Sequence, residues 1–195
     1  MSTVTTIIEG YVRDEGEDEY ASSSVTLVRD GNINILVDVG MDRERLLDAL
    51  NNENLRPIDI DFVVLTHTHL DHCLLTGIFE NAKILDVSSI YSFDGKITEH
   101  KGKIPGTEIE IIPTPGHDHH HSAVLVKTEE FGMVAIVADL FWWEDGQEQK
   151  TDRMSLLNLK DPYLNDGVIL RMSREKVLKM ADYIIPGHGK PFKLQ

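Results

Sequence analysis

The sequence predicts an α/β domain built in layers, with its chemistry on loops at one edge of the sheets. Apolar and β-branched segments of strand length recur along the chain, and helical segments lie between and after them. Eight of the nine histidines fall in three short segments. Two of these segments directly follow an apolar strand, and functional side chains gather on such loops. The length of 195 residues suits one domain over residues 1–195.

The first part of the chain predicts three strands. Residues 4–12 form the first, because of their β-branched content. Residues 13–19 carry five acidic side chains and are predicted to be a solvated, charged loop. The strands at 24–29 and 33–38 flank residues 30–32 (Asp-Gly-Asn), and an Asp-Gly pair between apolar runs favours a hairpin.

A helix and a buried strand are expected next. Asp42 is a suitable N-cap for a helix over 43–54, whose leucines share one face. Pro57 closes off this segment, since the residue before a proline disfavours helix. Residues 62–65 (Phe-Val-Val-Leu) are apolar throughout, which is typical of a strand covered on both faces.

The second half of the chain is mostly strands, then one helix. Residues 141–166 are polar and acidic and are predicted to be irregular. Ser173 is expected to cap a helix over 174–181, which precedes a short strand at 183–185. Residues 128–132 contain Gly132 and predict a hairpin connection. The remaining strands are predicted at 83–87, 107–113, 122–127 and 133–138.

Charge and composition exclude several classes of protein. With 33 acidic against 19 basic residues, the formal net charge is −14, which argues against an extended nucleic-acid face. No apolar run approaches the ~20 residues that span a bilayer, and the N-terminus lacks signal-peptide features. A single cysteine, Cys73, fits a reducing compartment and is expected to be a small buried filler. We expect a cytoplasmic protein without membrane contact.

The central histidine segment has the composition of a metal site. Residues 65–72 read Leu-Thr-His-Thr-His-Leu-Asp-His, so His67, His69, Asp71 and His72 follow the buried strand in one tight loop. Imidazole nitrogen and carboxylate oxygen suit zinc, iron, manganese or nickel. A polar loop without a ligand is the weaker alternative, because His and Asp are seldom packed so densely without an ion to hold.

Later segments supply further candidates. The turn at 113–116 (Pro-Thr-Pro-Gly) lies between two predicted strands and aims at least one histidine of the run 117–121 inward. Asp139 closes an apolar strand and could face solvent or bind a metal. His188 stands between two glycines directly after a short strand.

Taken in order, these segments resemble the metallo-β-lactamase superfamily. The shared pattern comprises the strand and turn at 35–40, His-x-His-x-Asp-His at 67–72, Gly-His at 116–117, Asp139, and Gly-His-Gly at 187–189. The resemblance covers nearly the whole chain. It implies a four-layer αββα sandwich with metals at one edge, between the two sheets.

The resemblance also implies two divalent metal ions, with Zn2+ expected and Fe or Mn as alternatives. The implied ligands are His67, His69 and His117 for the first ion, Asp71, His72 and His188 for the second, and Asp139 as a bridge.

The segment 114–122 departs from the family. The family motif reads Thr-Pro-Gly-His-Thr-x-Gly-His-Ser, whereas this chain has Asp-His-His after its first four residues. By the resemblance, His121 and Asp38 support the ligands instead of binding metal. His119 and His120 are left open, either as a solvated loop or as substrate contacts.

Two other features are also open. Trp142 and Trp143 follow Asp139 closely and could anchor a long loop in the core or form an aromatic wall for substrate. In relatives the segment comparable to residues 13–19 can overhang the metal site, so here it could filter substrates by charge.

The expected activity is metal-dependent hydrolysis. Two metals lower the pKa of a bridging water from about 15.7 to near 7, and the resulting hydroxide attacks a carbonyl or phosphoryl centre. Asp71 could orient this hydroxide or accept a proton, and Asp139 is expected to stay ionised. No Gly-x-Ser-x-Gly elbow occurs, so no serine nucleophile is expected.

The substrate stays unassigned. Residues 10–11, 24–28, 137–146 and 173–192 carry a further likeness to the family of metallo-β-lactamase domain-containing protein 1, whose animal member is regarded as an RNA endonuclease. A phosphodiesterase or ribonuclease is therefore one alternative. A thioesterase or lactonase is another, and a mononuclear iron persulfide dioxygenase is disfavoured by the complete second ligand set.

The partner expected from charge is a small-molecule or short anionic substrate. Two divalent ions add four positive charges to one cleft, against Asp71, Asp139 and one hydroxide, so the cleft stays net positive. The acidic surface still disfavours long contact with a polyanion. The oligomeric state is left open.

Overall fold

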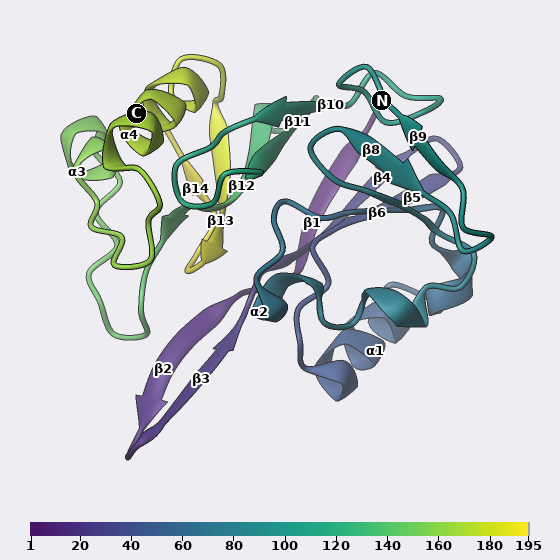
Figure 1. Cartoon of the computed structure of the whole chain (residues 1–195), viewed down its shortest axis with the longest axis horizontal. Coiled ribbons are helices and arrows are strands. Elements are labelled where there is room, and N and C mark those ends of the chain that lie inside the picture. The colour runs from purple at the N-terminus through teal and green to yellow at the C-terminus, as the bar shows by residue number, and fades with distance from the viewer. Residues whose placement is uncertain (195) are drawn as a thin grey trace.

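The computed structural model describes residues 1–194 and contains two facing β-sheets (Figure 1). The first sheet has the strand order β1-β4-β5-β6-β7-β8-β9, and the second has the order β10-β11-β12-β13-β14. The strands of the first sheet are β1 (Thr3–Ile8), β4 (Val25–Asp30), β5 (Ile33–Val37), β6 (Phe62–Val64), β7 (Lys83–Leu85), β8 (Ser89–Tyr91) and β9 (Ile97–Glu99). Those of the second are β10 (Glu110–Pro113), β11 (Ser122–Thr128), β12 (Gly132–Trp142), β13 (Tyr183–His188) and β14 (Phe192–Lys193).

Helices cover the outer faces of both sheets. Helix α1 (Arg43–Asn52) packs Leu46 and Leu50 against the first sheet. Helices α3 (Arg153–Leu157) and α4 (Gly167–Val177) pack against the second. Three short helices complete the set: α2 (Leu70–Cys73) and the 3-10 turns η1 (Pro57–Asp59) and η2 (Thr76–Ile78). None of the helices in residues 1–194 is long and apolar enough to cross a membrane.

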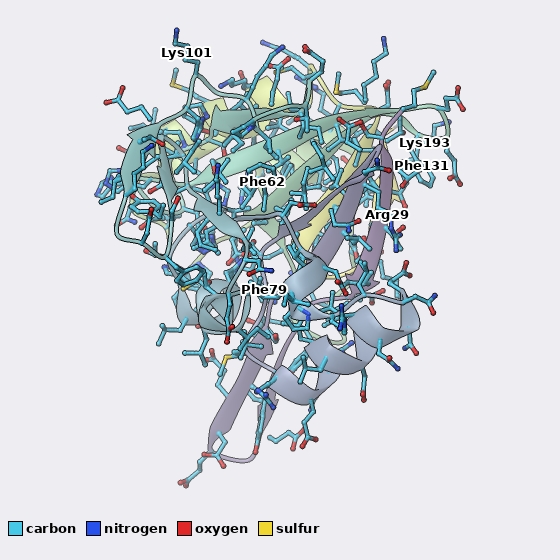
Figure 2. All side chains as sticks on the ribbon, turned by 90° about the vertical axis from the view of Figure 1, so that its right-hand side faces the viewer. Arg29, Phe62, Phe79, Lys101, Phe131 and Lys193 are labelled. Carbon is cyan, nitrogen blue, oxygen red and sulfur yellow. The ribbon has the colours of Figure 1, made fainter. Side chains whose placement is uncertain are left out.

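Three apolar layers hold the sheets and helices together. Phe62 belongs to the layer between the sheets, whereas Phe79 belongs to the layer between the first sheet and its helices (Figure 2). The third layer lies between the second sheet and α3 and α4, and Phe141 is buried within it. Burial on both faces of both sheets gives the four-layer αββα architecture, which confirms the predicted fold class.

Several elements match the sequence predictions. Strands β4 and β5 form the predicted hairpin, with Gly31 at a positive φ of 61° in the turn. The Asp42 carboxylate caps α1 by accepting a hydrogen bond from the Arg45 amide at 3.1 Å. Strand β6 is buried along its whole length, as its apolar sequence predicts.

The prediction of one strand over 4–12 is wrong, because the chain breaks at Gly10. Strand β1 joins the first sheet, whereas β2 (Tyr11–Glu15) pairs with β3 (Asp18–Ser22) in a separate ribbon. A Cβ at Gly10 would collide with the carbonyl oxygen of Gly187, so only glycine fits this crossing.

The predicted loop at 13–19 is therefore a β-hairpin instead. It turns at Gly16, whose φ is +70°, and it projects from the body of the molecule at the lower left of Figure 1. Its acidic side chains hide the strand pattern in the sequence, since Asp and Glu are depleted in strands.

Two predictions in the C-terminal third are also wrong. Residues 141–166 are not wholly irregular, because they include the end of β12 and helix α3. The last helix begins at Gly167 instead of residue 174, and its N-cap is Asp166, not Ser173. Ser173 lies inside α4, where its hydroxyl donates a hydrogen bond to the Pro115 carbonyl at 2.7 Å. Gly167, Val168 and Ile169 have low helix propensity, which conceals this start.

Candidate metal centre

The candidate ligands come from the ends of strands in both sheets. His67 and His69 lie on the loop between β6 and α2, and Asp71 and His72 lie in α2 itself. The second sheet contributes three more, from the loop after β10, from within β12 and from the end of β13: His117, Asp139 and His188. All seven predicted ligands therefore meet at one edge of the sandwich.

One group of four surrounds a single point. His67, His69, His117 and Asp139 each offer a ligand atom, and these atoms lie within 4.8 Å of one another. His117 Nε2 is 3.2 Å from His69 Nδ1 and 3.4 Å from Asp139 Oδ2. His69 thus presents its Nδ1 atom to this point, whereas His67 and His117 present Nε2.

A second group lies beside the first. Asp71, His72 and His188 offer ligand atoms within 4.8 Å of one another. Asp71 Oδ2 is 3.2 Å from His188 Nε2 and 3.6 Å from His72 Nε2. Asp71 is the more open member, because 21% of its side chain is exposed whereas His72 is fully buried.

Asp139 lies between the two groups. Its Oδ2 faces His67 and His117, at 3.9 and 3.4 Å from their Nε2 atoms. Its Oδ1 faces the second group, at 3.2 Å from His72 Nε2 and 3.5 Å from His188 Nε2. The carboxylate therefore turns one oxygen toward each group, which is the arrangement that a bridging ligand needs.

Three polar atoms at the centre lack hydrogen-bond partners. His67 Nε2, His72 Nε2 and Asp139 Oδ1 are buried and make no hydrogen bond within residues 1–194. The 3.2 Å approach of His72 to Asp139 does not have hydrogen-bond geometry. Each such buried atom costs roughly 1–3 kcal/mol if left unpaired. Nitrogen and oxygen donors that converge without partners fit a divalent metal ion of the zinc, iron or manganese type.

Asp38 organises two of the histidines from behind. Its Oδ2 accepts a hydrogen bond from His72 Nδ1 at 2.8 Å and another from the Thr66 hydroxyl at 2.8 Å. The Thr66 oxygen in turn lies 3.1 Å from His67 Nδ1 and accepts its proton. Both imidazoles therefore carry their proton on Nδ1, which leaves the Nε2 lone pairs free for a metal.

The other two histidines that turn Nε2 toward the centre are also held through a hydrogen bond from Nδ1. His188 Nδ1 donates to the Tyr11 carbonyl at 3.1 Å, and His117 Nδ1 donates to Asp161 Oδ2 at 2.7 Å. Asp161 is buried and was not predicted as a site residue. It lies 44 residues beyond His117 in a segment without a motif, so only the fold reveals the contact.

Burial and close charges shift the pKa values of the centre in opposite directions. Burial lowers the pKa of His67, and the nearby His72 lowers it further. Burial also opposes the charged form of His72, but Asp139 and Asp38 outweigh it and raise the pKa of His72 well above 6.5. For Asp139, burial alone would raise the pKa, yet His72 and His188 hold it well below the ordinary carboxyl range. Asp139 is therefore ionised at neutral pH.

The backbone is specialised where the ligands meet. Asp38 and Ala138 have positive φ values of 53° and 43°, which are uncommon for residues other than glycine. Ala138 lies at a register shift between β12 and β13, directly before Asp139. A Cβ at Gly187 would collide with the Asp139 carboxylate. The strained backbone at Ala138 thus lies directly beside Asp139, the residue between the two ligand groups.

The other predicted histidines lie outside both ligand groups. His121 is fully buried, with its ring centroid 5.1 Å from that of His67, and Thr114 Oγ1 contacts its Nδ1 at 2.9 Å. Burial lowers the pKa of His121 to about 3. His119 and His120 are exposed and do not line the cleft described next, and their role in substrate contact stays a prediction.

The ligands open onto a cleft of about 170 Å3. Val12, Glu19 and Ala21 of the β2–β3 hairpin form one wall, and Trp142 and Tyr163 form the other. The hairpin therefore overhangs the candidate centre and brings one carboxylate, that of Glu19, to its mouth.

Trp142 and Trp143 lie in different surroundings: one is at the cleft and the other is in the core. The Trp142 ring lies 6.2 Å from that of His188 and 5.9 Å from that of Tyr163, so it lies at the cleft. Trp143 is buried in the core between the second sheet and its helices, with its ring 5.9 Å from that of Phe192.

Comparison with known proteins identifies the family. The Metallo-beta-lactamase superfamily model matches residues 20–91. Metallo-beta-lactamase domain-containing protein 1 of Xenopus laevis is 34% identical over 98% of this chain and 82% of its own length. The chain belongs to the metallo-β-lactamase superfamily. The human protein of the same name is also 34% identical, over 82% of this chain, and the match spans only 59% of its length.

Solved structures of the metallo-β-lactamase superfamily share the fold. A Thermotoga maritima protein, described as a metallo-beta-lactamase candidate, superimposes with a TM-score of 0.74 at 20% identity, covering 98% of this chain and 99% of its own. The dizinc quorum-quenching lactonase AidC gives a TM-score of 0.64 at 18% identity, covering 88% of this chain and 73% of its own.

A further relative by sequence, a Methanocaldococcus jannaschii protein named as a probable metallo-hydrolase, is 33% identical over 79% of this chain and 70% of its own.

Proposed function

We propose that this member of the metallo-β-lactamase superfamily is a hydrolase with a binuclear, zinc-containing centre. The observation that carries the proposal is Asp139, whose two oxygens face two separate ligand groups. The first ion would be held by His67, His69 and His117, the second by Asp71, His72 and His188, and both by Asp139.

The chain's own residues would hold and orient the reactants. Ions bound at the two groups would supply an activated water and neutralise the negative charge that develops on the substrate. Asp71 lines the cleft, and its carboxylate would orient the attacking water and accept its proton. Asp38 and Asp161 would keep His72 and His117 in the tautomer that binds metal.

The small cleft favours a small-molecule or short anionic substrate with a carbonyl or phosphoryl centre. Its volume of about 170 Å3 suits the reactive end of a molecule. Among hydrolysable bonds, we place lactones and thioesters first, because the fold is shared with a dizinc lactonase. Phosphodiesters come second, since the acidic hairpin wall is unfavourable for a polyanion.

Metal analysis followed by a substrate panel tests the proposal. We expect two zinc ions per chain and turnover of at least one of a lactone, a thioester, a phosphodiester or a β-lactam by metal-loaded protein. His67→Ala should abolish this turnover, whereas His100→Ala, outside the three histidine segments, should retain it. A single tightly held iron, or turnover that survives His67→Ala, would contradict the proposal.

A further inference from the structure

Arg174 of helix α4 is a buried cation without a carboxylate partner. It is only 3% exposed. Its Nε donates to the Leu140 carbonyl at 2.8 Å and its Nη1 donates to the Leu159 carbonyl at 2.6 Å. Its Nη2 is buried without a hydrogen-bond partner, and no carboxylate oxygen within residues 1–194 forms an ion pair with Arg174.

This guanidinium keeps its charge at neutral pH. Burial lowers the pKa of Arg174 to about 10, which is still well above 7. Burying a charge without an opposite partner is costly, so such groups are normally paired or bind a ligand. The Phe141 ring, 5.6 Å from the guanidinium carbon, offers a cation–π contact but no hydrogen-bond acceptor for Nη2. The Asp161 carboxylate raises the pKa of Arg174 but forms no ion pair or hydrogen bond with it, so Nη2 is left to bind an anion from outside the chain.

Arg174 lines an open cleft that could admit such an anion. The cleft has a volume of about 710 Å3, within the range of small-molecule sites, and its wall includes the apolar side chains of Leu157 and Leu164. Lys160 and Arg171 also line it, although Arg171 lies 3.7 Å from Glu175.

The carboxylates at this cleft form no ion pair with Arg174. Asp161 directs Oδ2 to His117 Nδ1 at 2.7 Å, and its Oδ1 accepts from the Tyr163 amide at 3.0 Å. The carboxylates of Glu144 and Asp161 both line the cleft, and Arg171 is already paired with Glu175. The cleft is therefore close to neutral, and its particular feature is the buried Arg174 Nη2 without a hydrogen-bond partner in the described part of the chain.

The cleft adjoins the candidate metal centre through Trp142. This side chain lines both clefts, and its ring lies 6.2 Å from that of His188. Its indole N–H is buried without a partner within residues 1–194, so it is a second donor without an acceptor. We propose that this cleft is a subsite for an acidic group of the substrate, a carboxylate or a phosphate, held by Arg174 with the Trp142 indole beside it. The link to substrate rests on the proposed hydrolase, whereas anion binding can be tested alone.

The two tryptophans provide a direct test. The 15N-labelled, metal-free full chain should give two indole N–H signals, and Trp142→Phe identifies the one from Trp142. Titration with benzoate and with phenyl phosphate should shift that signal saturably with at least one of them, and these two titrations distinguish carboxylate from phosphate. Benzyl alcohol, which has no charge, should not shift it. Absence of a saturable shift with both anions would overturn the subsite.

Variants then locate the anion. Arg174→Met should weaken binding by about 10-fold or more, as expected for the loss of a hydrogen bond to a charged group. Because Arg174 also holds two backbone carbonyls, Lys160→Gln is a second variant that keeps those contacts and should weaken binding about 2-fold. Arg153→Gln removes a positive charge from an exposed residue that does not line the cleft, so it should bind as the wild type does.

The outcomes separate the subsite from the hydrolase. Wild-type affinity in both a folded Arg174→Met and Lys160→Gln would place the anion elsewhere, such as at the histidines, and overturn the subsite. Hydrolysis without anion binding at Trp142 would refute the subsite alone. Anion binding with no hydrolysis in the substrate panel would refute the proposed function alone.

Discussion

Asp161 acts on the candidate centre through His117, and its removal should weaken metal binding. Asp161→Asn replaces the acceptor of the 2.7 Å hydrogen bond with a weaker one and no longer balances the imidazole charge. Loss of such a contact typically costs about 10–100-fold in metal affinity. A zinc titration against a chelator measures this. Asp48→Asn, on the exposed face of α1, removes the same charge and should leave zinc affinity unchanged; equal affinities in all three proteins would exclude a role for Asp161.

Gly187 is required by the position of Asp139. In Gly187→Ala the new methyl group meets the Asp139 carboxylate, so the bridging position cannot be kept. We expect bound zinc to fall below one ion per two chains, with far-UV circular dichroism close to wild type. Gly77→Ala is the control, because a Cβ there meets nothing within 4 Å. Full zinc occupancy in Gly187→Ala would show that Asp139 does not need this space.

Metal binding should release protons at neutral pH. Burial disfavours the charged forms of His72 and His117, but Asp139 and Asp38 raise the pKa of His72 and the hydrogen bond to Asp161 raises that of His117. Both shifts favour the protonated imidazole in the metal-free protein, and such a proton must leave before the nitrogen binds metal.

Calorimetry in buffers of different ionisation enthalpy measures that release. We expect protons to be released on zinc loading, and zinc affinity to fall as the pH falls. Zinc affinity that does not change between pH 6 and 8 would contradict the raised pKa values.

At the residue scale, the sequence revealed the groups that belong to motifs and not the groups that support them. His67, His69 and His72 are separated by one or two residues, so their spacing is visible in the chain. Asp161 and the Tyr11 carbonyl reach their histidines across 44 and 177 residues. Such contacts depend on how the sheets pack, which no local pattern records.

Among the elements, α4 couples helix stability to the metal centre. Its N-cap Asp166 accepts hydrogen bonds from the Val168 and Ile169 amides, both at 2.9 Å, and the Asp166 amide donates to the Gly116 carbonyl beside His117 at 2.9 Å. Asp166→Ala should therefore lower the free energy of unfolding by about 1 kcal/mol, and it should also weaken zinc binding because the His117 loop loosens.

Asp152→Ala provides the matched comparison. Asp152 caps α3 in the same way, through the Met154 and Ser155 amides, but contacts no ligand loop. Urea unfolding should give a similar loss of about 1 kcal/mol with zinc affinity unchanged. If both variants weaken zinc binding equally, the effect comes from global destabilisation and α4 has no special link to His117.

Elements with a clear pattern of apolar residues could be predicted from the sequence. Elements that depend on tertiary contacts could not. Strand β6 and helix α1 carry their own signals, a buried run and a capped leucine face. The β2–β3 hairpin is acidic and largely exposed, so its sequence resembles a loop. Strand β12 continues through Asp139 to Trp142 because it pairs with β13 beyond a register shift, which the charged residue at 139 conceals in the sequence.

At the scale of the whole molecule, the net charge of −14 is distributed unevenly. The cleft at the candidate centre has acidic Glu19 at its mouth, whereas the neighbouring cleft is lined by Lys160, Arg171 and Arg174. That composition disfavours a broad basic face stays a prediction, and composition does not locate the three cationic side chains of the second cleft. Three of the nineteen basic residues gather there because α4 and the segment before it fold over one end of the second sheet.

The two halves of the sandwich should be joined by the metals. The first sheet side provides His67, His69, Asp71 and His72, and the second provides His117, Asp139 and His188. Ions held by both sides bind only the folded chain, so zinc at 100 times its dissociation constant should add about 2.7 kcal/mol to the free energy of unfolding. For a chain of this length, that corresponds to a rise in Tm of roughly 5–11 °C. Scanning calorimetry with zinc and with a chelator measures the difference, and Asp139→Asn, which removes the carboxylate common to both groups, should lose most of it. A Tm that is the same with and without zinc would mean that the ions do not hold the two halves together.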